Sequence, residues 1–451
     1  MRPYFGFAQY KSVVKIKLNF GRRLRQWLFL GICCLALAGC QVAKNSDDGI
    51  TYLTLWQGVN PPPNRDVLQT LVEHFNQTHS EIQVESLYIG QPDQQLPKIL
   101  SAVVGNAPPD MLWFSPMLTG QLVELNAIVP LEDKLTRSSV YDQIDPALFE
   151  AMQYNEHIWS VPFGTNNVGI FYRPSLFKAA GITQLPRTWE ELRQVAQQLT
   201  QDTDRDGRVD RYGILLPLGK GEWTVFNWLP FMWSGGGELI PKEAALSDNA
   251  QTAPINLVNE GAIAALQLWQ DLIKDGSAVL SLPERGYELD GFLAGKVAMQ
   301  LTGPWTLGQL QATGVDFDVF PIPTEVKPAT AMGGENLFIF KTTPEQEAAA
   351  FKFAEYVLSE EFQTEWALKT GYLPVNLNSR KSAAYQEFLT KLPVVKVFLE
   401  QAAIARSRPI FPGYNRISEN LGRAIESVLL DKNTPVEALK ASQQRLNLIF
   451  N

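Results

Sequence analysis

The segment Ile50-Thr51-Tyr52-Leu53-Thr54-Leu55-Trp56 begins an alternation of strands and helices. Its β-branched and aromatic residues are typical of a β-strand, which the prolines at 61–63 end. Apolar residues at helical spacing then predict a helix around Leu68 to Phe75. The pattern continues with a strand from Ile82, a helix over 97–104 and the strand Met111-Leu112-Trp113-Phe114. This β-α-β-α-β order predicts an α/β fold with a mostly parallel sheet covered by helices.

A second alternating unit follows later in the chain. We expect strands at 169–172 and 212–216 with a helix over 189–199 between them, and then helices at 260–274, 345–358 and 417–430. No internal repeat or low-complexity tract interrupts the pattern. Because about 400 residues exceed the size at which one core keeps growing, the sequence predicts two lobes.

The N-terminus has the organisation of an export signal. A cluster of cationic residues precedes an uncharged apolar stretch from Trp27 to Ala38, and it includes Lys11, Lys15, Lys17, Arg22, Arg23 and Arg25. Twelve apolar residues form a helix of only about 18 Å, which is shorter than a stable membrane span. Residues 1–39 are therefore predicted to be a cleaved signal peptide; the alternative is an uncleaved signal anchor.

The end of this signal resembles the lipobox of bacterial lipoproteins. Leu37-Ala38-Gly39-Cys40 places small residues before a cysteine, and the resemblance implies that the Cys40 thiol carries a lipid (palmitate among its acyl chains). Residues 40–49 then form a polar, lipidated tether. The mature protein is expected to be exported and held at the outer side of the membrane, in a periplasm or at the cell surface.

Charge and cysteine content exclude several classes of protein. Loss of residues 1–39 removes seven Lys and Arg residues and no acidic residue, which takes the formal net charge from −8 to −15. Such an acidic chain is a poor nucleic-acid binder. Cys40 is the only cysteine left, so no intramolecular disulfide can form. Eleven Trp residues suit a pocket that stacks flat, partly apolar ligands.

Several separated motifs resemble, in the same order, the extracellular solute-binding proteins of ABC importers, the family that includes maltose-binding protein. These motifs are Pro108-Pro109-Asp110-Met111, Val161-Pro162-Phe163, Asn166-Asn167-Val168-Gly169-Ile170-Phe171-Tyr172, Pro186-Arg187-Thr188-Trp189-Glu190-Glu191-Leu192, Phe292-Leu293-Ala294-Gly295-Lys296-Val297-Ala298-Met299, Gly303-Pro304-Trp305, Gly333-Gly334, Gly371-Tyr372-Leu373-Pro374 and Thr434-Pro435-Val436-Glu437-Ala438-Leu439. Each motif is weak alone, but the ordered set spans nearly all of the mature chain.

The resemblance implies a type II periplasmic-binding-protein fold, in which two α/β lobes close on a ligand in the cleft between them. The first lobe would comprise 50–163 and 301–343, and the second 164–300 and 344–451. The chain would cross between the lobes near 162–166, 300–305 and 342–344. Hinge residues at these crossings would take up the changes in backbone φ and ψ that accompany closure. The protein would act as a monomer that binds a solute without changing it and delivers it to the membrane permease.

The resemblance also points to ligand contacts. Asp110 stands in a loop that faces the cleft in the family, where a carboxylate accepts hydrogen bonds from sugar hydroxyls; the alternative is a cap aspartate. Trp305 matches a family position at which the indole stacks on a sugar ring, and Tyr172 is a similar candidate. Packing in the core is the alternative for both rings.

Two glycine-rich segments and one aromatic segment add candidates. Trp223, Trp228 and Trp233 are five residues apart, so the three indoles cannot share one helix face and at least one packs in the core. We expect Trp228 and Trp233, beside the glycines at 235–237, to contact the ligand. Gly334 and Glu335 are expected to line the cleft as well, with Glu335 as an acceptor for hydroxyls.

Tyr414 and Arg416, which follow Pro412-Gly413, are the weakest of the candidate ligand contacts.

The loop Asp202-Thr203-Asp204-Arg205-Asp206-Gly207-Arg208-Val209-Asp210 resembles the opening of an EF-hand calcium loop. Carboxylates of Asp202, Asp204, Asp206 and Asp210 and the backbone carbonyl of Arg208 would surround one structural Ca²⁺. Position 12 is Gly213, so the usual bidentate glutamate is missing. The alternative is a solvated acidic turn. No other cofactor is expected.

The leading functional prediction is capture of a sugar, oligosaccharide or glycosylated polyol for an ABC importer. One alternative is a phosphorylated polyol such as glycerol 3-phosphate, for which Arg416 or Arg285 would supply the positive charge. The other is a secreted carbohydrate hydrolase with two carboxylates about 5–10 Å apart. Nucleophile-elbow, zinc-protease and P-loop signatures are absent from the sequence, and none of the three His has metal-ligand spacing.

Overall fold

The computed structural model describes residues 49–240, 255–281, 289–410 and 412–450. The signal segment, Cys40, nearly all of the tether and Arg285 lie outside these residues. Residues from Thr51 onward form one unit, which is the part considered below. Within the described residues, no helix combines the length and the apolar character that a membrane span requires.

The first sheet contains β1, whose sequence predicted a strand. The described strands run in the order β13-β12-β3-β1-β2, and β6 pairs with β12 beside this path. They are β1 (Thr51–Gln57), β2 (Ile82–Tyr88), β3 (Met111–Phe114), β6 (Ser160–Asn167), β12 (Thr330–Ile339) and β13 (Ala405–Arg406). β1 pairs in parallel with β2 and β3, whereas β12 is antiparallel to β3 and β6. The sheet is therefore mixed, with a parallel half built from the first alternating unit.

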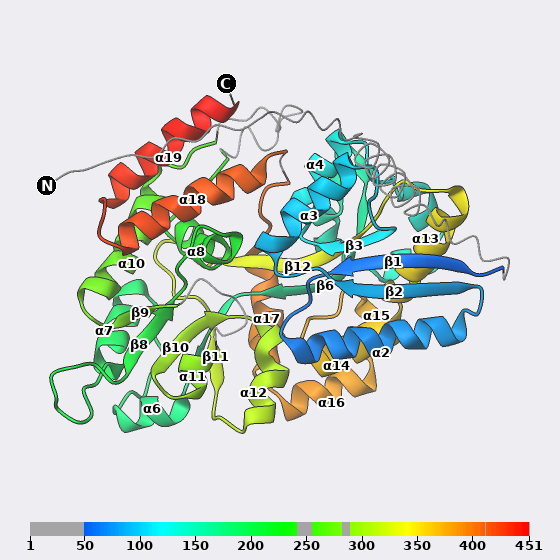
Figure 1. Cartoon of the computed structure of the whole chain (residues 1–451). Helices are drawn as coiled ribbons and strands as arrows, with labels where there is room; N and C mark the ends of the chain where they lie inside the picture. The colour runs from blue at the N-terminus through cyan, green and yellow to red at the C-terminus, as the bar shows by residue number, and fades with distance from the viewer. Residues whose placement is uncertain (1–48, 241–254, 282–288, 411, 451) are drawn as a thin grey trace, which may run out of the picture. The chain divides into compact units, whose positions relative to one another are not determined.

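Both faces of β3 are packed against hydrophobic cores, so the sheet lies between two layers of helices. The side chains of β3 alternate between two hydrophobic cores, with Met111 and Trp113 in one and Leu112 and Phe114 in the other. Both faces must therefore be covered. Figure 1 shows α2, α14 and α16 on one side of the sheet and α3 and α4 on the other. These helices are α2 (Pro62–Thr78), α3 (Pro92–Val104), α4 (Thr119–Glu124), α14 (Glu360–Thr370) and α16 (Ala383–Lys391). Two more helices belong to this lobe: α13 (Pro344–Leu358) packs on β1, β6 and β12, and α15 (Leu377–Lys381) packs against α14 and α16.

The second sheet is built around β10, in which all six residues are buried. Its described strands run in the order β11-β7-β10-β8-β9, with β10 parallel to β8 and antiparallel to β7. They are β7 (Gly169–Tyr172), β8 (Tyr212–Leu216), β9 (Ala278–Leu280), β10 (Val297–Thr302) and β11 (Asp318–Phe320). A separate hairpin joins β4 (Gln153–Tyr154) and β5 (His157–Ile158).

Some helices pack on strands of the second sheet, and others pack mainly on one another. α7 (Trp189–Leu199) begins with a capping box in which Thr188 and Glu191 cap each other's backbone, and it buries one apolar face that includes Leu192 and Leu199. α18 (Tyr414–Leu429) packs against α8 (Glu222–Ser234), α10 (Glu260–Lys274) and α19 (Pro435–Phe450). The remaining helices on the described residues are α5 (Glu132–Leu135), α6 (Pro174–Ala179), α11 (Asp290–Leu293), α12 (Leu307–Thr313), α17 (Val395–Gln401) and the 3₁₀ turns at 116–118, 141–143, 146–151, 304–306 and 402–404.

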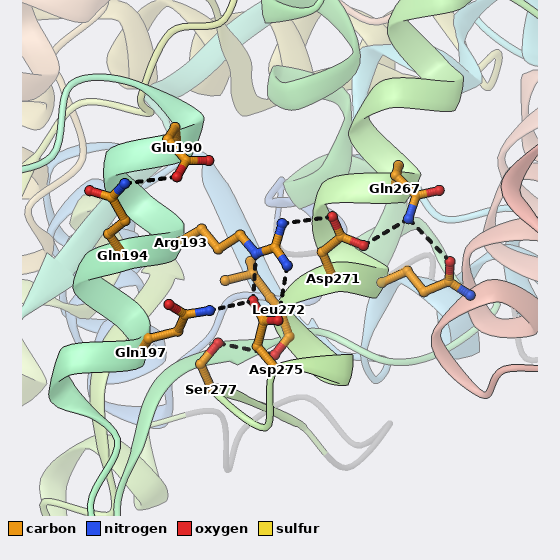
Figure 2. A network of polar contacts seen from close by, with 10 residues as sticks. Glu190, Arg193, Gln194, Gln197, Gln267, Asp271, Leu272, Asp275 and Ser277 are labelled. Atoms are coloured by element: carbon orange, nitrogen blue, oxygen red, sulfur yellow. Dashed lines mark hydrogen bonds and ion pairs between the residues drawn. The ribbon is translucent and has the colours of Figure 1, made fainter.

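An ion-pair network joins α7 to α10 (Figure 2). Arg193 Nη2 lies 2.9 Å from Asp275 Oδ1, its Nη1 lies 3.0 Å from Asp271 Oδ2, and Gln197 also donates to Asp275. The hydrogen bond from Arg193 holds the pKa of Asp275 below its ordinary value, against the effect of burial. This network fixes the two helices against each other at the edge of the lobe.

The chain passes between the sheets at positions that differ from those expected. It leaves the first sheet at Val168, between β6 and β7, two residues after the expected crossing at 162–166. It returns between β11 and β12, over 321–329, rather than at 300–305, because β11 pairs with β7 and extends the second sheet. At 342–344 it stays with the first sheet, since α13 packs on β1, β6 and β12. Residues 318–320 thus lie with the second sheet and 344–358 with the first, unlike the expected lobe boundaries.

Candidate functional site

A cleft of about 810 Å³ lies where the first sheet meets the starts of α8 and α18. The first sheet contributes Trp113–Ser115 at the carboxyl end of β3, and Gly333–Glu335 within β12. Residues 221–223 at the start of α8 and 413–415 at the start of α18 also line it. Ligands of open α/β sheets bind outside the carboxyl ends of strands, and this volume is typical of small-molecule sites.

The glycines in β12 allow this strand to approach β6 and to direct Glu335 to the cleft. A Cβ on Gly333 would lie 2.1 Å from Asn166 Oδ1, and one on Gly334 would lie 2.2 Å from the carbonyl oxygen of Gly164. Gly334 also has φ +111°, which favours glycine. The β6–β12 register shifts directly after Glu335, and a bulge of this kind re-aims the neighbouring side chain. Tyr372 Oη lies 3.4 Å from Glu335 Oε2.

Aromatic rings form one wall of the cleft. Trp305, which is 3% exposed, contacts Trp223 edge to face, with ring centroids 5.9 Å apart and an interplanar angle of 73°. Phe226 lies beside both rings, with its centroid 6.5 Å from that of Trp305. Trp113 and Tyr372 line the cleft as well. Such a wall offers flat apolar surfaces for the faces of a ring-shaped ligand.

Four lining residues include a buried polar atom that has no hydrogen-bond partner among the described residues. These atoms are Asn166 Oδ1, Trp305 Nε1, Arg408 Nε and Tyr414 Oη. Burial raises the pKa of Tyr414 well above its ordinary value, and the nearby Glu222 carboxylate adds to this effect, so the phenol is neutral. Because unpartnered buried polar atoms are costly, these donors and acceptors suit hydroxyl groups of a bound ligand.

The cations that line the cleft are neutralised. Among the described lining residues, they are Lys220 and Arg408. Arg408 Nη1 lies 2.7 Å from Glu222 Oε1, and Lys220 Nζ lies 3.6 Å from Glu426 Oε2. Sequence reasoning did not identify Arg408, Glu222 or Phe226, since no motif marks them. Trp223 was recognised only as a member of the Trp series.

Four of the predicted contacts line the cleft, namely Trp305, Gly334, Glu335 and Tyr414. Arg416 does not. It follows Tyr414 on the first turn of α18 but is exposed. It therefore supplies no positive charge to the described wall of the cleft.

Asp110 requires a correction, because it lies at the other end of β3 from the cleft. Its Oδ2 accepts from the backbone N–H of Thr54 at 2.7 Å and from Thr54 Oγ1 at 3.0 Å. The Thr54 hydroxyl oxygen in turn accepts from the Asp110 backbone N–H at 3.1 Å. The carboxylate thus ties β1 to the start of β3 and does not face the site.

Tyr172 is also placed away from the cleft. Its ring packs against Phe177 and Phe320, with centroids 4.6 and 5.6 Å away, and its hydroxyl lies 3.4 Å from Asp318 Oδ2. Burial, together with the Asp318 charge, raises the pKa of Tyr172 to about 12. The residue is part of the core around the edge pair β7–β11.

The order of the Trp series along α8 reverses our expectation. Trp228 is fully buried, and Trp233 is 2% exposed, with Arg406 Cζ 5.0 Å from its ring centroid. Neither lines the cleft, because the middle and end of α8 are surrounded by the core. Trp223 is the member that reaches the site, since it lies at the start of the helix.

The acidic loop brings three of its four carboxylates together. Oxygen atoms of Asp202, Asp204 and Asp210 lie within 4.8 Å of one another, and all three residues are exposed. Asp206 is not part of this cluster, and its carboxylate accepts from the backbone N–H of Arg208 at 2.8 Å. A calcium ion at this loop stays a prediction, and the geometry supports three of the expected carboxylate ligands.

Comparison with known proteins identifies the family. The model of the bacterial extracellular solute-binding proteins matches residues 70–390. The sn-glycerol-3-phosphate-binding periplasmic protein UgpB of Pectobacterium atrosepticum is 22% identical over 440 residues, covering 92% of this chain and 93% of that protein. The maltotriose-binding protein of Pyrococcus abyssi is 21% identical over 410 residues, covering 89% and 83%.

Solved structures share the fold. An ABC transporter solute-binding protein from Thermotoga lettingae, bound with α-D-tagatose, superposes with a TM-score of 0.78 at 24% identity, covering 89% of this chain and 100% of that one. The expected type II fold is thereby confirmed. Since the family model spans well over half of the sequence, the chain belongs to the bacterial extracellular solute-binding proteins.

Proposed function

We propose that this chain is the lipid-anchored binding component of an ABC importer and captures a neutral hydroxylated solute, such as a sugar, an oligosaccharide or a glycosylated polyol. One observation carries the choice of ligand: the cleft has an aromatic wall with Trp305 and Trp223, buried polar atoms without partners, and cations that carboxylates already neutralise. Aromatic rings pack against the apolar faces of sugar rings, and hydroxyls satisfy the polar atoms. The relative that binds maltotriose supports this class.

A phosphorylated polyol is the second candidate, and the start of two helices at the cleft favours it. Residues 221–223 and 413–415 open α8 and α18, and helix N-termini attract anions. A relative that binds sn-glycerol 3-phosphate is consistent with it. However, the carboxylates of Glu222, Glu335 and Glu419 also line the cleft, so a phosphate would meet negative charge there. The neutral class therefore has the stronger support.

The role in an importer requires both closure of the lobes on the solute and a position beside the permease. Ligand binding would favour the closed arrangement of the two lobes by its higher affinity for that state. The lipid on Cys40 and a short polar tether would keep the protein beside its permease at high effective concentration. We infer that the protein acts as a monomer and releases its solute unchanged, which is consistent with its membership of a family of solute-binding proteins.

A thermal-shift panel on the mature chain tests the ligand class. We expect a neutral sugar, disaccharide or glycosylated polyol to raise the melting temperature; at a hundredfold excess over Kd the stabilisation is about 2.7 kcal/mol. Chromatography of the same sample after incubation should recover the sugar intact. Stabilisation by anionic solutes alone would refute the neutral class, and consumption of the sugar would refute the binding role. A membrane-extracted protein whose N-terminal peptide has no lipid on Cys40 by mass spectrometry would refute the lipid anchor.

A further inference from the structure

Arg408 is the group in the cleft best suited to hold an anion, and it is tightly fixed. Its side chain is 8% exposed and its guanidinium lies over the Phe226 ring, with Cζ 4.6 Å from the centroid. Nη1 donates to Glu222 Oε1 at 2.7 Å, and Nη2 lies 3.4 Å from Ser115 Oγ. Nε is buried without a partner among the described residues. Glu222 thus already accepts from one of the three nitrogen atoms that the guanidinium could direct to an anion.

Three interactions hold the Glu222 carboxylate in place: one with Arg408, one with the start of α8 and one with α18. Glu222 is the first residue of α8, so its negative charge lies at the positive end of the helix dipole. The Ser418 hydroxyl on α18 donates to its second oxygen. The carboxylate therefore lies where Arg408, the start of α8 and the first turns of α18 come together. These are the features of the cleft that would otherwise attract a phosphate.

We propose that Glu222 determines the charge selectivity of the cleft, acting as a built-in counter-ion that occupies the anion position on Arg408. This inference rests on the proposed function, because it explains why a cleft that binds neutral solutes would bind phosphorylated ones weakly. A phosphate monoester carries a charge of about −1.5 to −2 at neutral pH and would have to displace Glu222 or lie beside it. A hydroxyl leaves the ion pair intact. Lys220 offers no substitute, since its Nζ lies near Glu426.

The test compares the wild-type mature chain with Glu222→Gln, using sn-glycerol 3-phosphate as the probe and isothermal titration at low salt. Glutamine keeps the shape and can still bond Ser418 and Arg408, but it removes the charge. We expect Glu222→Gln to bind the phosphate ester at least tenfold more tightly than the wild type, which corresponds to about 1.4 kcal/mol. The double variant Glu222→Gln, Arg408→Gln should lose this gain.

Equal affinity of the wild type and Glu222→Gln for the phosphate ester, including no detectable binding by either, overturns the inference. If Glu222→Gln does not fold, Glu222→Asp replaces it: the shorter side chain withdraws the carboxylate, and we expect at least a threefold gain, whereas no gain is a refutation. The neutral-sugar panel is a separate measurement. A gain in Glu222→Gln without sugar binding by the wild type would refute the proposed function alone, and sugar binding without the gain would refute only this inference.

Discussion

Replacing Asp110 with alanine should destabilise the protein without weakening its ligand binding. This result would distinguish the structural role seen here from the ligand contact that the motif predicts. Asp110 Oδ2 accepts two hydrogen bonds from Thr54, and both groups are partly buried. Alanine leaves the Thr54 N–H without this acceptor. A hydrogen bond to a charged group contributes about 1.5–3 kcal/mol, and two bonds to one oxygen are not additive, so we expect a loss of about 3 kcal/mol.

The expected shift in melting temperature follows from the size of the folded unit. Unfolding entropy is about 2.1 cal/mol/K per residue, so about 400 residues that unfold together give about 0.84 kcal/mol/K. A loss of 3 kcal/mol then lowers the melting temperature by about 3.5 °C. Asp110→Asn is the matched control: its amide oxygen can still accept from Thr54, so we expect less than half of this loss. Differential scanning calorimetry measures both variants.

Ligand affinity decides between the two roles. A structural Asp110 predicts that Asp110→Ala, measured by titration well below its melting temperature, binds the sugar found in the panel within about twofold of the wild type. A tenfold or greater loss of affinity together with an unchanged melting temperature would show that Asp110 contacts the ligand and that our assignment is wrong.

Three further perturbations test other parts of the structure. Trp305→Ala should weaken binding of that sugar at least tenfold by titration, and Trp305→Phe less so, because a ring remains for stacking; equal loss in both would argue against stacking. Asp275→Asn should lower the free energy of unfolding in urea by about 1.5–3 kcal/mol at pH 7. The pKa of Asp275 is lower in the folded than in the unfolded protein, so its stabilising effect is present above the unfolded pKa near 3.9 and is lost as pH falls through the folded pKa. The difference in unfolding free energy between variant and wild type should therefore decrease below pH 4. A difference that stays constant with pH would contradict the pairing with Arg193. Calcium should raise the melting temperature of the wild type but not of Asp204→Ala, with Asp206→Asn close to wild type because its carboxylate lies outside the cluster; an equal response of all three would exclude this site.

Local sequence patterns predicted most helices and strands, because caps and runs of apolar residues determine these elements within a short stretch of sequence. The helix over 189–199 agrees with α7 at both ends, since Thr188 and Glu191 form the capping box that begins it. The strand at 111–114 agrees with β3, whose four apolar residues are buried on both faces. The lobe crossings were harder to place. β11 is a three-residue strand whose membership depends on its pairing with β7, about 150 residues away, and no local signal encodes that pairing.

The site shows the same division between local and long-range causes. Gly334 and Glu335 could be predicted because glycines that permit a close approach of two strands are visible in the sequence. Trp223 and Trp228 lie on the same helix, and the packing of α8 decides that Trp228 is in the core and Trp223 lines the cleft.

Arg408 marks the limit of sequence reasoning at this site. It belongs to no motif, and its role depends on Glu222 and Ser418, which come from two helices separated by nearly 200 positions. Arg416 was an expected cation for a phosphorylated ligand, yet it is exposed on α18, whereas Arg408, in the segment that follows β13, has a side chain that is 8% exposed. A sequence search for positive charge therefore identifies the wrong arginine, and it would also misjudge the right one. In our proposal the charge that a solute meets at this point is that of the Arg408–Glu222 pair, which joins the start of α8 to the segment after β13, so neither residue alone sets the charge of this part of the cleft.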